Sequence, residues 1–244
     1  MPKTEPFEKY IDEYDEWFKK NFALYEAELE AIRQLIPSPG AEGMEVGVGS
    51  GKFAAPLGIK TGVEPSEKMA NKARMQGIKV YPGVAEELPF SDGRFDFVLM
   101  VTTICFVDDV VKSFSEAFRV LNPGGCIIVG FVDKESELGR QYAENREESK
   151  FYKYATFFST QEVLKYLKKA GFEIVKIRQT LIPGELPEAI LDGFGKGAFV
   201  VIKGERHKTG YRDREEPHSS PLPHHRTYGS VSGGSADQGR SGAE

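Results

Sequence analysis

The sequence predicts an α/β fold in which helices cover both faces of a mostly parallel sheet. Short β-rich runs alternate with amphipathic helical stretches along most of the 244 residues. A glycine-rich turn follows the first β-rich run, as in many ligand-binding α/β sheets. The last two β-rich runs, 172–181 and 198–203, have no comparable helical pattern between them, which predicts an antiparallel pair at one edge of the sheet.

The first 39 residues are predicted to be helical. Apolar side chains recur three and four residues apart from Phe7 to Phe18 and again from Tyr25 to Ile36. This spacing is typical of one or two amphipathic helices. The run PSPG at 37–40 then ends the helical pattern.

The central part of the chain supplies the parallel strands and their helices. Predicted strands lie at 43–48, 61–64, 78–81, 95–101 and 126–131. Helical patterns lie between them at 66–76 and 110–121, and a further one at 160–170 is closed by Gly171. A chain of this length, with 40% hydrophobic residues, can bury the core of one domain.

Two segments depart from this alternation. The stretch 133–158 is longer than a connection needs to be and carries an aromatic cluster, so we interpret it as a lid or an acceptor-pocket wall, with a core-filling helical insert as the alternative. From Glu205 onward Pro, Gly, Ser and His dominate without periodicity, which predicts a disordered tail. The expected organisation is therefore a helical segment at 1–39, a domain at 40–204 and a tail at 205–244.

The strongest functional signal is the run EVGVGSG at 45–51. Glycines at alternate positions after an apolar strand let the backbone turn sharply and approach a ligand closely. Glu64, at the end of the next predicted strand, has the reach to accept hydrogen bonds from both hydroxyls of a ribose. These residues predict a nucleotide-cofactor site.

Spacing separates the cofactor classes that use such glycines. A dinucleotide fold has a third glycine three positions after the second, where this chain has Lys52, so an NAD-dependent oxidoreductase is disfavoured. A P-loop needs Ser or Thr after Gly-Lys, but Phe53 follows Gly51-Lys52. Val46 also stands where the first P-loop glycine would be.

Four motifs, taken in order, resemble those of a family that is neither a dinucleotide-binding fold nor a P-loop protein. They are EVGVGSG (45–51), VAEELPF (84–90), FDFV (95–98) and RVLNPGG (119–125). In this order and spacing the chain resembles the class I S-adenosylmethionine-dependent methyltransferases (EC 2.1.1), in particular the type-11 domain of the quinone-biosynthesis methyltransferases. The resemblance covers about Tyr10 to Lys203. It implies a Rossmann-like, doubly wound seven-stranded sheet of order 3-2-1-4-5-7-6, with an antiparallel last strand and an N-terminal helical lid at 1–39.

The resemblance also implies that S-adenosyl-L-methionine is the cofactor and indicates the residues that hold it. Glu45 would organise the glycine loop, and Glu64 would bind the ribose hydroxyls. Val84 stands where the family commonly has Asp, so adenine recognition would rest on the backbone of the next two residues. The other cofactor-binding residues implied are Tyr14, Gly47, Gly49, Gly51, Pro65, Ser66, Met69, Ala85, Glu86, Val101, Thr102 and Thr103.

The distribution of histidine limits the choice of a general base. All four histidines, at 207, 218, 224 and 225, fall in the predicted tail. Methyl transfer can proceed without a histidine, because positioning the nucleophile and the methyl carbon in a dry pocket provides much of the catalysis. Where deprotonation is needed, the catalytic candidates are Tyr14, Asp15, Glu135 and Tyr154, and none stands out by spacing.

The methyl acceptor is expected to be a small molecule. Enzymes that methylate the exocyclic amines of nucleobases or glutamine carry Asn/Asp-Pro-Pro-Tyr/Phe after the fourth strand, where this chain has TTIC at 102–105. The net charge of −5 also argues against a nucleic-acid partner. The alternative is a regulatory module that binds the cofactor without turnover. The oligomeric state is not predicted.

Composition gives three further expectations. No run approaches the roughly 20 apolar residues that a bilayer-spanning helix needs, and the acidic N-terminus is unlike a signal peptide. We therefore expect a cytoplasmic protein. Cys105 and Cys126 lie in apolar runs, where a buried thiol is usual, and no cluster of metal ligands is present in the sequence.

Overall fold

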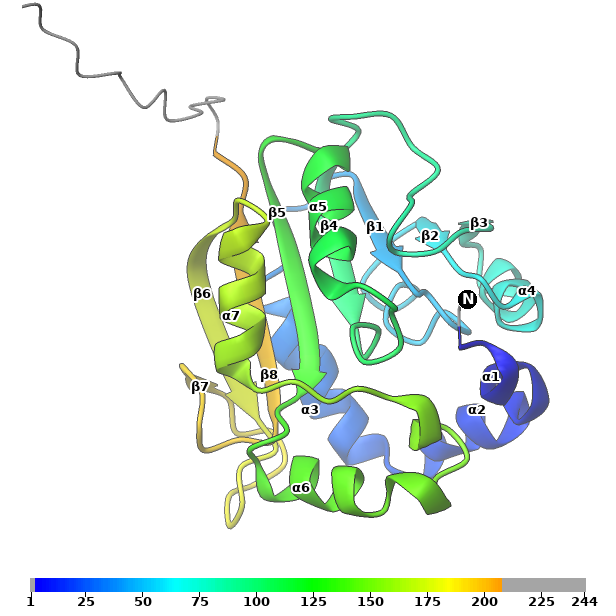
Figure 1. The fold of residues 1–244 in the computed structure, drawn as a ribbon, viewed down its shortest axis with the longest axis vertical. Helices are drawn as coiled ribbons and strands as arrows, with labels where there is room; N and C mark the ends of the chain where they lie inside the picture. Colours follow the sequence, from blue (N-terminus) through cyan, green and yellow to red (C-terminus); the bar gives the residue numbers. More distant parts are fainter. Residues whose placement is uncertain (1–2, 208–244) are drawn as a thin grey trace, which may run out of the picture. The chain divides into compact units, whose positions relative to one another are not determined.

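The computed structural model describes residues 3–207, which form an eight-stranded mixed sheet with helices on both faces (Figure 1). Of the predicted tail, residues 208–244 lie outside the described residues. The N-terminal segment forms three helices, α1 (Glu5–Lys9), α2 (Ile11–Lys20) and α3 (Phe22–Arg33), where one or two were expected. None of the helices described is both long and apolar enough to cross a membrane.

The remaining elements follow the predicted alternation of strands and helices. In chain order they are β1 (Gly43–Val46), β2 (Thr61–Val63), α4 (Glu67–Met75), β3 (Lys79–Tyr81), β4 (Phe95–Val101), α5 (Val110–Val120), β5 (Leu121–Val132), α6 (Glu137–Glu144), the short 3-10 helices η1 (Arg146–Glu148) and η2 (Tyr152–Tyr154), α7 (Thr160–Lys169), β6 (Glu173–Thr180), β7 (Leu191–Asp192) and β8 (Phe199–Glu205).

The strand order is β3-β2-β1-β4-β5-β8-β6-β7. The first five strands are parallel, and β8 runs antiparallel to both β5 and β6. The predicted doubly wound fold and its antiparallel last strand are therefore confirmed. The structure adds β7, a two-residue strand that pairs with the outer edge of β6.

Both faces of the sheet are buried, as the apolar composition of β4 requires. Val98 and Met100 belong to one core, with side chains of α5 and α7, while Leu99 and Val101 belong to the other, with side chains of α3 and α4. Figure 1 shows α5 and α7 on the near side of the sheet and α3 on the far side. Because successive strand residues point to opposite faces, one apolar strand serves both cores.

Side-chain caps fix where several helices begin. Ser66, Asp109, Ser136 and Ser159 each accept a hydrogen bond from the backbone N–H three residues further on. At α7 the cap is reciprocal, because Glu162 also accepts the N–H of Ser159. The cap at Ser66 starts α4 directly after β2, at the sheet edge where ligands of α/β folds bind.

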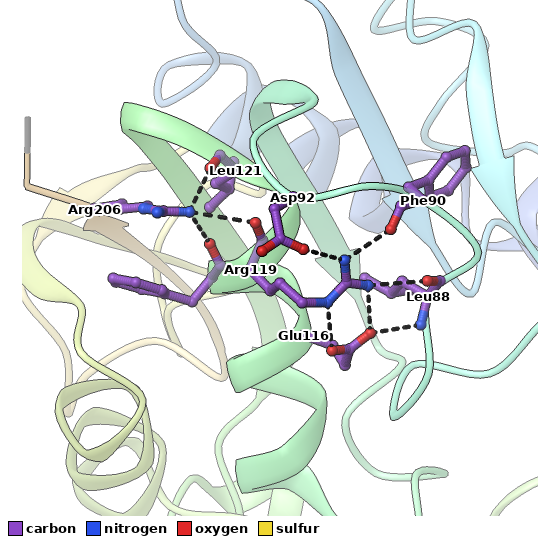
Figure 2. A network of polar contacts seen from close by, with 8 residues as sticks. Leu88, Phe90, Asp92, Glu116, Arg119, Leu121 and Arg206 are labelled. Atoms are coloured by element: carbon purple, nitrogen blue, oxygen red, sulfur yellow. Dashed lines mark hydrogen bonds and ion pairs between the residues drawn. The ribbon is translucent and has the colours of Figure 1, made fainter. Parts of the chain in front are cut away.

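An arginine at the end of α5 holds the loop between β3 and β4. The Arg119 guanidinium donates to the carbonyl oxygens of Leu88 (3.0 Å) and Phe90 (2.7 Å) and to the carboxylates of Glu116 and Asp92 (Figure 2). Glu116 in turn accepts the Leu88 N–H at 2.9 Å. This network fixes the loop that carries residues 84–86 to α5.

Candidate active site

A cavity of about 520 Å³ lies at the carboxyl ends of β1, β2 and β4. Side chains from α1, α2 and α3 and from residues 142–152 enclose it. Its volume is typical of small-ligand sites, which measure about 300–1,000 Å³. Eleven of the residues that the family resemblance implies for the cofactor line this cavity, namely Tyr14, Gly47, Gly49, Glu64, Pro65, Met69, Ala85, Glu86, Val101, Thr102 and Thr103.

The glycine loop that follows β1 has the backbone conformation that the glycine motif requires. Gly47 and Gly49 have φ angles of +69° and +54°, in the left-handed region that favours glycine. A Cβ at Gly47 would lie 2.6 Å from the Thr103 side chain, so no other residue fits there without displacement. The Thr103 hydroxyl donates to the Val46 carbonyl at 3.1 Å and so ties β1 to the end of β4.

Glu64 is held in place by two backbone donors. Its carboxylate oxygens accept the N–H of Gly49 and the N–H of Ser66, each at 2.9 Å. The side chain is 8% exposed, and burial raises the pKa of Glu64 while these two donors oppose the rise. Since each carboxylate oxygen can accept more than one hydrogen bond, the group retains acceptor capacity on its cavity side.

Glu45 lies beneath the glycine loop and does not line the cavity. It is 2% exposed, and its Oε2 has no hydrogen-bond partner among the described residues. Burial raises the pKa of Glu45 well above its usual value, against a hydrogen bond from the Ala54 N–H. An unpaired buried carboxylate oxygen is costly, so this atom is ready to accept a hydrogen bond from a ligand or from water.

Two other predicted cofactor residues support the loop from outside the cavity. A Cβ at Gly51 would lie 2.8 Å from Ile78, so this glycine lets the loop pack against the residue that precedes β3. The Ser66 hydroxyl caps α4 and donates to a Glu8 carboxylate oxygen at 2.6 Å. Both residues position backbone next to the cavity.

The acidic side chain of Glu86 is engaged in the protein rather than turned toward a ligand. Its Oε1 accepts the backbone N–H groups of Asp108 (2.6 Å) and Asp109 (3.1 Å), in the loop before α5. Ala85 and Glu86 line the cavity, and the contact of their backbone with the adenine, which the resemblance implies, stays a prediction.

The predicted catalytic candidates fall in different places. Tyr14 lines the cavity beside Gly49, and burial, followed by the charges of Glu45 and Glu64, raises the pKa of its hydroxyl. Asp15 points away, toward Ser50 and Lys72. Tyr154 and Glu135 are exposed and do not line the cavity.

Sequence reasoning missed one acidic residue that does line the cavity, Glu28 of α3. It is 6% exposed, and burial raises its pKa to about 8. A signal was present, because Glu28 lies three residues after Tyr25 and four before Ile32, within the apolar stripe of the helix. Aromatic side chains make up much of the wall, namely Phe7, Tyr14, Trp17, Phe18, Phe53, Phe106, Tyr142, Phe151 and Tyr152.

Comparison with known proteins defines the family. Residues 44–129 match the family described as a methyltransferase domain. An uncharacterised protein of Methanocaldococcus jannaschii is 44% identical over 204 residues, which are 82% of this chain and 98% of that protein. Demethylmenaquinone methyltransferase of Staphylococcus aureus is 29% identical over 170 residues, which are 57% of this chain and 70% of that protein.

A solved structure from Thermotoga maritima is similar over nearly its whole length. It is described as a SAM-dependent methyltransferase, possible histamine N-methyltransferase, and is 50% identical. The TM-score is 0.79, with 83% of this chain and 99% of that chain covered. The chain therefore belongs to the S-adenosylmethionine-dependent methyltransferases, as the four motifs indicated, and its cofactor is S-adenosyl-L-methionine.

The residues at the Glu64 side of the cavity fit this cofactor. Glu64 presents a fixed, buried carboxylate, a group that can accept the hydrogen bonds of a diol, and the glycine loop beside it carries no side chains at positions 47 and 49. The unpaired Oε2 of Glu45 lies outside the cavity lining, so a water molecule would have to connect it to an amino group in the cavity.

Proposed function

We propose that this protein is an enzyme that transfers the methyl group of S-adenosylmethionine to a small-molecule acceptor. One observation carries the proposal: a single cavity has a polar nucleoside side at Glu64 and an aromatic side at α2, α3 and residues 142–152. The cofactor supplies an electrophilic methyl group on a sulfonium sulfur. The alternative is a module that binds the cofactor without turnover.

The roles of the residues follow from their positions. Glu64 would accept the ribose hydroxyls, Glu45 would receive the amino group, and the backbone at Ala85 and Glu86 would meet the adenine. The aromatic side chains from α1 and α2 make the space beside the glycine loop largely apolar. Holding two reactants together in a water-free pocket is the main requirement for an in-line transfer.

The activities ascribed to two relatives support a small acceptor. The Thermotoga maritima protein is described as a possible histamine N-methyltransferase, and the Staphylococcus aureus relative as a demethylmenaquinone methyltransferase. Both acceptors are small molecules, although their chemistry differs. The aromatic side of the cavity suits a compact organic acceptor.

A methyl-transfer assay tests this proposal. The purified protein is incubated with radiolabelled methyl donor and a panel of amine, thiol, phenol and quinol acceptors, with cell extract as a further source of acceptors. We expect label to appear in one acceptor class. Donor binding with no label transferred to any acceptor or to the extract would favour the binding module instead.

A further inference from the structure

Glu28 is a buried acid that faces the cavity without a partner. Its side chain is 6% exposed, and no side chain or backbone group of the described residues makes a hydrogen bond or ion pair with its carboxyl. A buried carboxyl group with no partner is unfavourable unless a ligand or a proton compensates for it. Glu28 therefore has the character of a ligand-binding group.

The surroundings of Glu28 contain no compensating cation. The basic residues among the described cavity lining are Lys3 and Lys112. The charge of Lys3 acts on Cys105 and Asp108, and that of Lys112 acts on Glu116. Burial alone accounts for the raised pKa of Glu28, so neither lysine reaches it electrostatically.

Instead, aromatic rings surround this part of the cavity. The rings of Phe7 and Phe106 (centroids 5.0 Å apart), Phe106 and Tyr152 (6.1 Å), and Tyr142 and Tyr152 (5.1 Å) form a continuous wall. The negative charge of Glu28 acts on Tyr14, Tyr25, Tyr142 and Tyr152 and contributes to raising the pKa of each, although burial contributes more. A carboxyl group beside aromatic faces suits an organic cation, which binds favourably to both.

We propose that the acceptor is an organic amine, bound through its ammonium group to Glu28, and that Glu28 takes the proton that must leave the nitrogen before methylation. This inference rests on the proposed function and specifies its acceptor. It assigns a catalytic role to a residue of α3 that lies outside the four motifs and outside every candidate predicted from the sequence.

The step consists of a proton transfer followed by a methyl transfer. The ammonium gives one proton to the Glu28 carboxylate, which leaves a lone pair on nitrogen. That lone pair forms the new N–C bond to the donated methyl group, the C–S bond breaks, and its electron pair stays on sulfur as a neutral thioether. The methylated product leaves as an ammonium ion, and Glu28 releases its proton to solvent.

The same features disfavour a methyl acceptor that carries a negative charge. A phenolate or an ionised quinol would place a negative charge beside Glu28 in a site without a neighbouring cation. Like charges at close range in a buried site repel strongly. An amine that enters as an ammonium ion is thus favoured over a hydroxyl that enters already ionised.

A binding experiment tests the proposal independently of turnover. The protein is saturated with S-adenosylhomocysteine and titrated with 2-phenylethylamine or with its uncharged counterpart 2-phenylethanol. Trp17, the only tryptophan of the chain, lines the cavity and reports binding by its fluorescence. We expect the amine to bind at least about tenfold more tightly than the alcohol, and Glu28→Gln to abolish this preference.

Matched variants separate this role from a structural one. Glu26→Gln makes the same chemical change at an exposed position of α3 and should retain the preference for the amine. Glu28→Gln should bind S-adenosylhomocysteine as the wild type does, which also shows that it is folded. The proposal would be overturned if the wild type bound the amine and the alcohol equally well or bound neither detectably. It would also be overturned if Glu28→Gln kept the wild-type preference for the amine.

The pH dependence of turnover provides a second readout. For an amine that the wild type methylates, kcat/KM should rise with pH to an inflection near 8, and Glu28→Gln should lose about 100-fold in kcat/KM together with that inflection. The facing tyrosines do not titrate in this range, since the pKa of each is raised above its usual value near 10. Label transfer only to phenols or thiols would overturn the amine assignment and leave the proposed methyltransferase function intact. Failure of the wild type to bind the donor would overturn the proposed function itself.

Discussion

Two buried carboxyl groups distinguish the two sides of the cavity. Glu64 is fixed by backbone donors from the glycine loop and from the start of α4, whereas Glu28 has no partner among the described residues. The first arrangement positions an acceptor for hydroxyl groups. The second leaves a group that can change its protonation state when a ligand binds.

Replacing Glu64 with alanine should weaken donor binding. Two ribose hydroxyls would lose a charged acceptor, at a cost of about 1.5–3 kcal/mol, or roughly 10- to 150-fold in Kd. Titration calorimetry with S-adenosylhomocysteine measures this directly. Glu87→Ala, which removes an exposed carboxylate from the neighbouring loop, should bind like the wild type. An unchanged Kd in Glu64→Ala would remove Glu64 from the cofactor site.

Glu28 should make stability depend on pH in a defined direction. Its pKa is raised from 4.5 to about 8, so between these values the folded protein binds more protons than the unfolded chain. The stability of the wild type therefore falls as pH rises through this window, by roughly 3–5 kcal/mol from this residue. Glu28→Gln lacks this loss. The free energy of unfolding of the variant minus that of the wild type, measured by denaturant titration, should therefore increase from pH 5 to pH 8. A difference that is independent of pH would contradict the assignment.

The sequence could identify Glu64 but not the role of Glu28, and the reason is physical. Glu64 lies in a local pattern, since a glycine loop and the next strand end are a fixed distance apart in this fold. The environment of Glu28 depends on rings contributed by α1, α6 and η2, which are far away in the chain. Only its place within an apolar helical stripe was visible beforehand.

At the scale of elements, an ion-pair cluster fastens α2 over the glycine loop. The Asp15 carboxylate accepts from the Ser50 hydroxyl (2.8 Å) and from Lys72 of α4 (2.7 Å), and Lys52 lies 3.3 Å away. Burial opposes ionisation, but these donors and charges leave the pKa of Asp15 below its usual value. Asp15 therefore stays charged at neutral pH, and its position suits fastening the helix rather than accepting a proton.

Asp15→Asn should loosen α2 over the cavity. Loss of this partly buried charge should cost about 1 kcal/mol, weaken donor binding about three- to tenfold, and speed proteolytic cleavage within residues 5–20. Asp12→Asn is the matched control, because Asp12 also pairs with Lys72 but its side chain is 94% exposed. Equal effects of the two variants on donor affinity would show that the cluster does not hold α2 in place.

Elements with regular periodicity were predictable, and those defined by tertiary pairing were not. The predicted and observed bounds of β4 agree, because an apolar strand between two cores has a clear pattern. The two residues of β7 have no pattern of their own and are defined by pairing with Arg178 and Gln179. The breaks at Tyr10 and Asn21 likewise occur without the Pro or Gly that would mark a helix end.

In the described chain as a whole, the residue that follows β8 joins the C-terminal end of the sheet to the junction of α5 and β5. The Arg206 guanidinium donates to the carbonyl oxygens of Phe118, Arg119 and Leu121, at the junction of α5 and β5 (Figure 2). It also lies over the Phe118 ring, 4.7 Å from its centroid. Backbone hydrogen bonds join Arg206 to Gly124 and Gly125 as well.

Truncation of the chain should therefore have a sharp boundary. Ending the protein after Lys203 removes Arg206 and the last residues of β8, which should cost about 2–4 kcal/mol and lower Tm by roughly 5–15 °C. Ending it after His207 keeps all of these contacts and should leave Tm and donor affinity unchanged. Calorimetric melting of both forms checks this, and equal melting temperatures would show that the Arg206 network adds no stability.

A crystal structure of the S-adenosylhomocysteine complex would show whether one side of the cavity holds the donor and the other side is left for the acceptor. We expect the ribose hydroxyls to donate to Glu64 and the sulfur to face the aromatic space that contains Glu28. A ligand whose ribose does not contact Glu64, or whose sulfur faces away from that space, would contradict the division of the cavity into a donor side and an acceptor side.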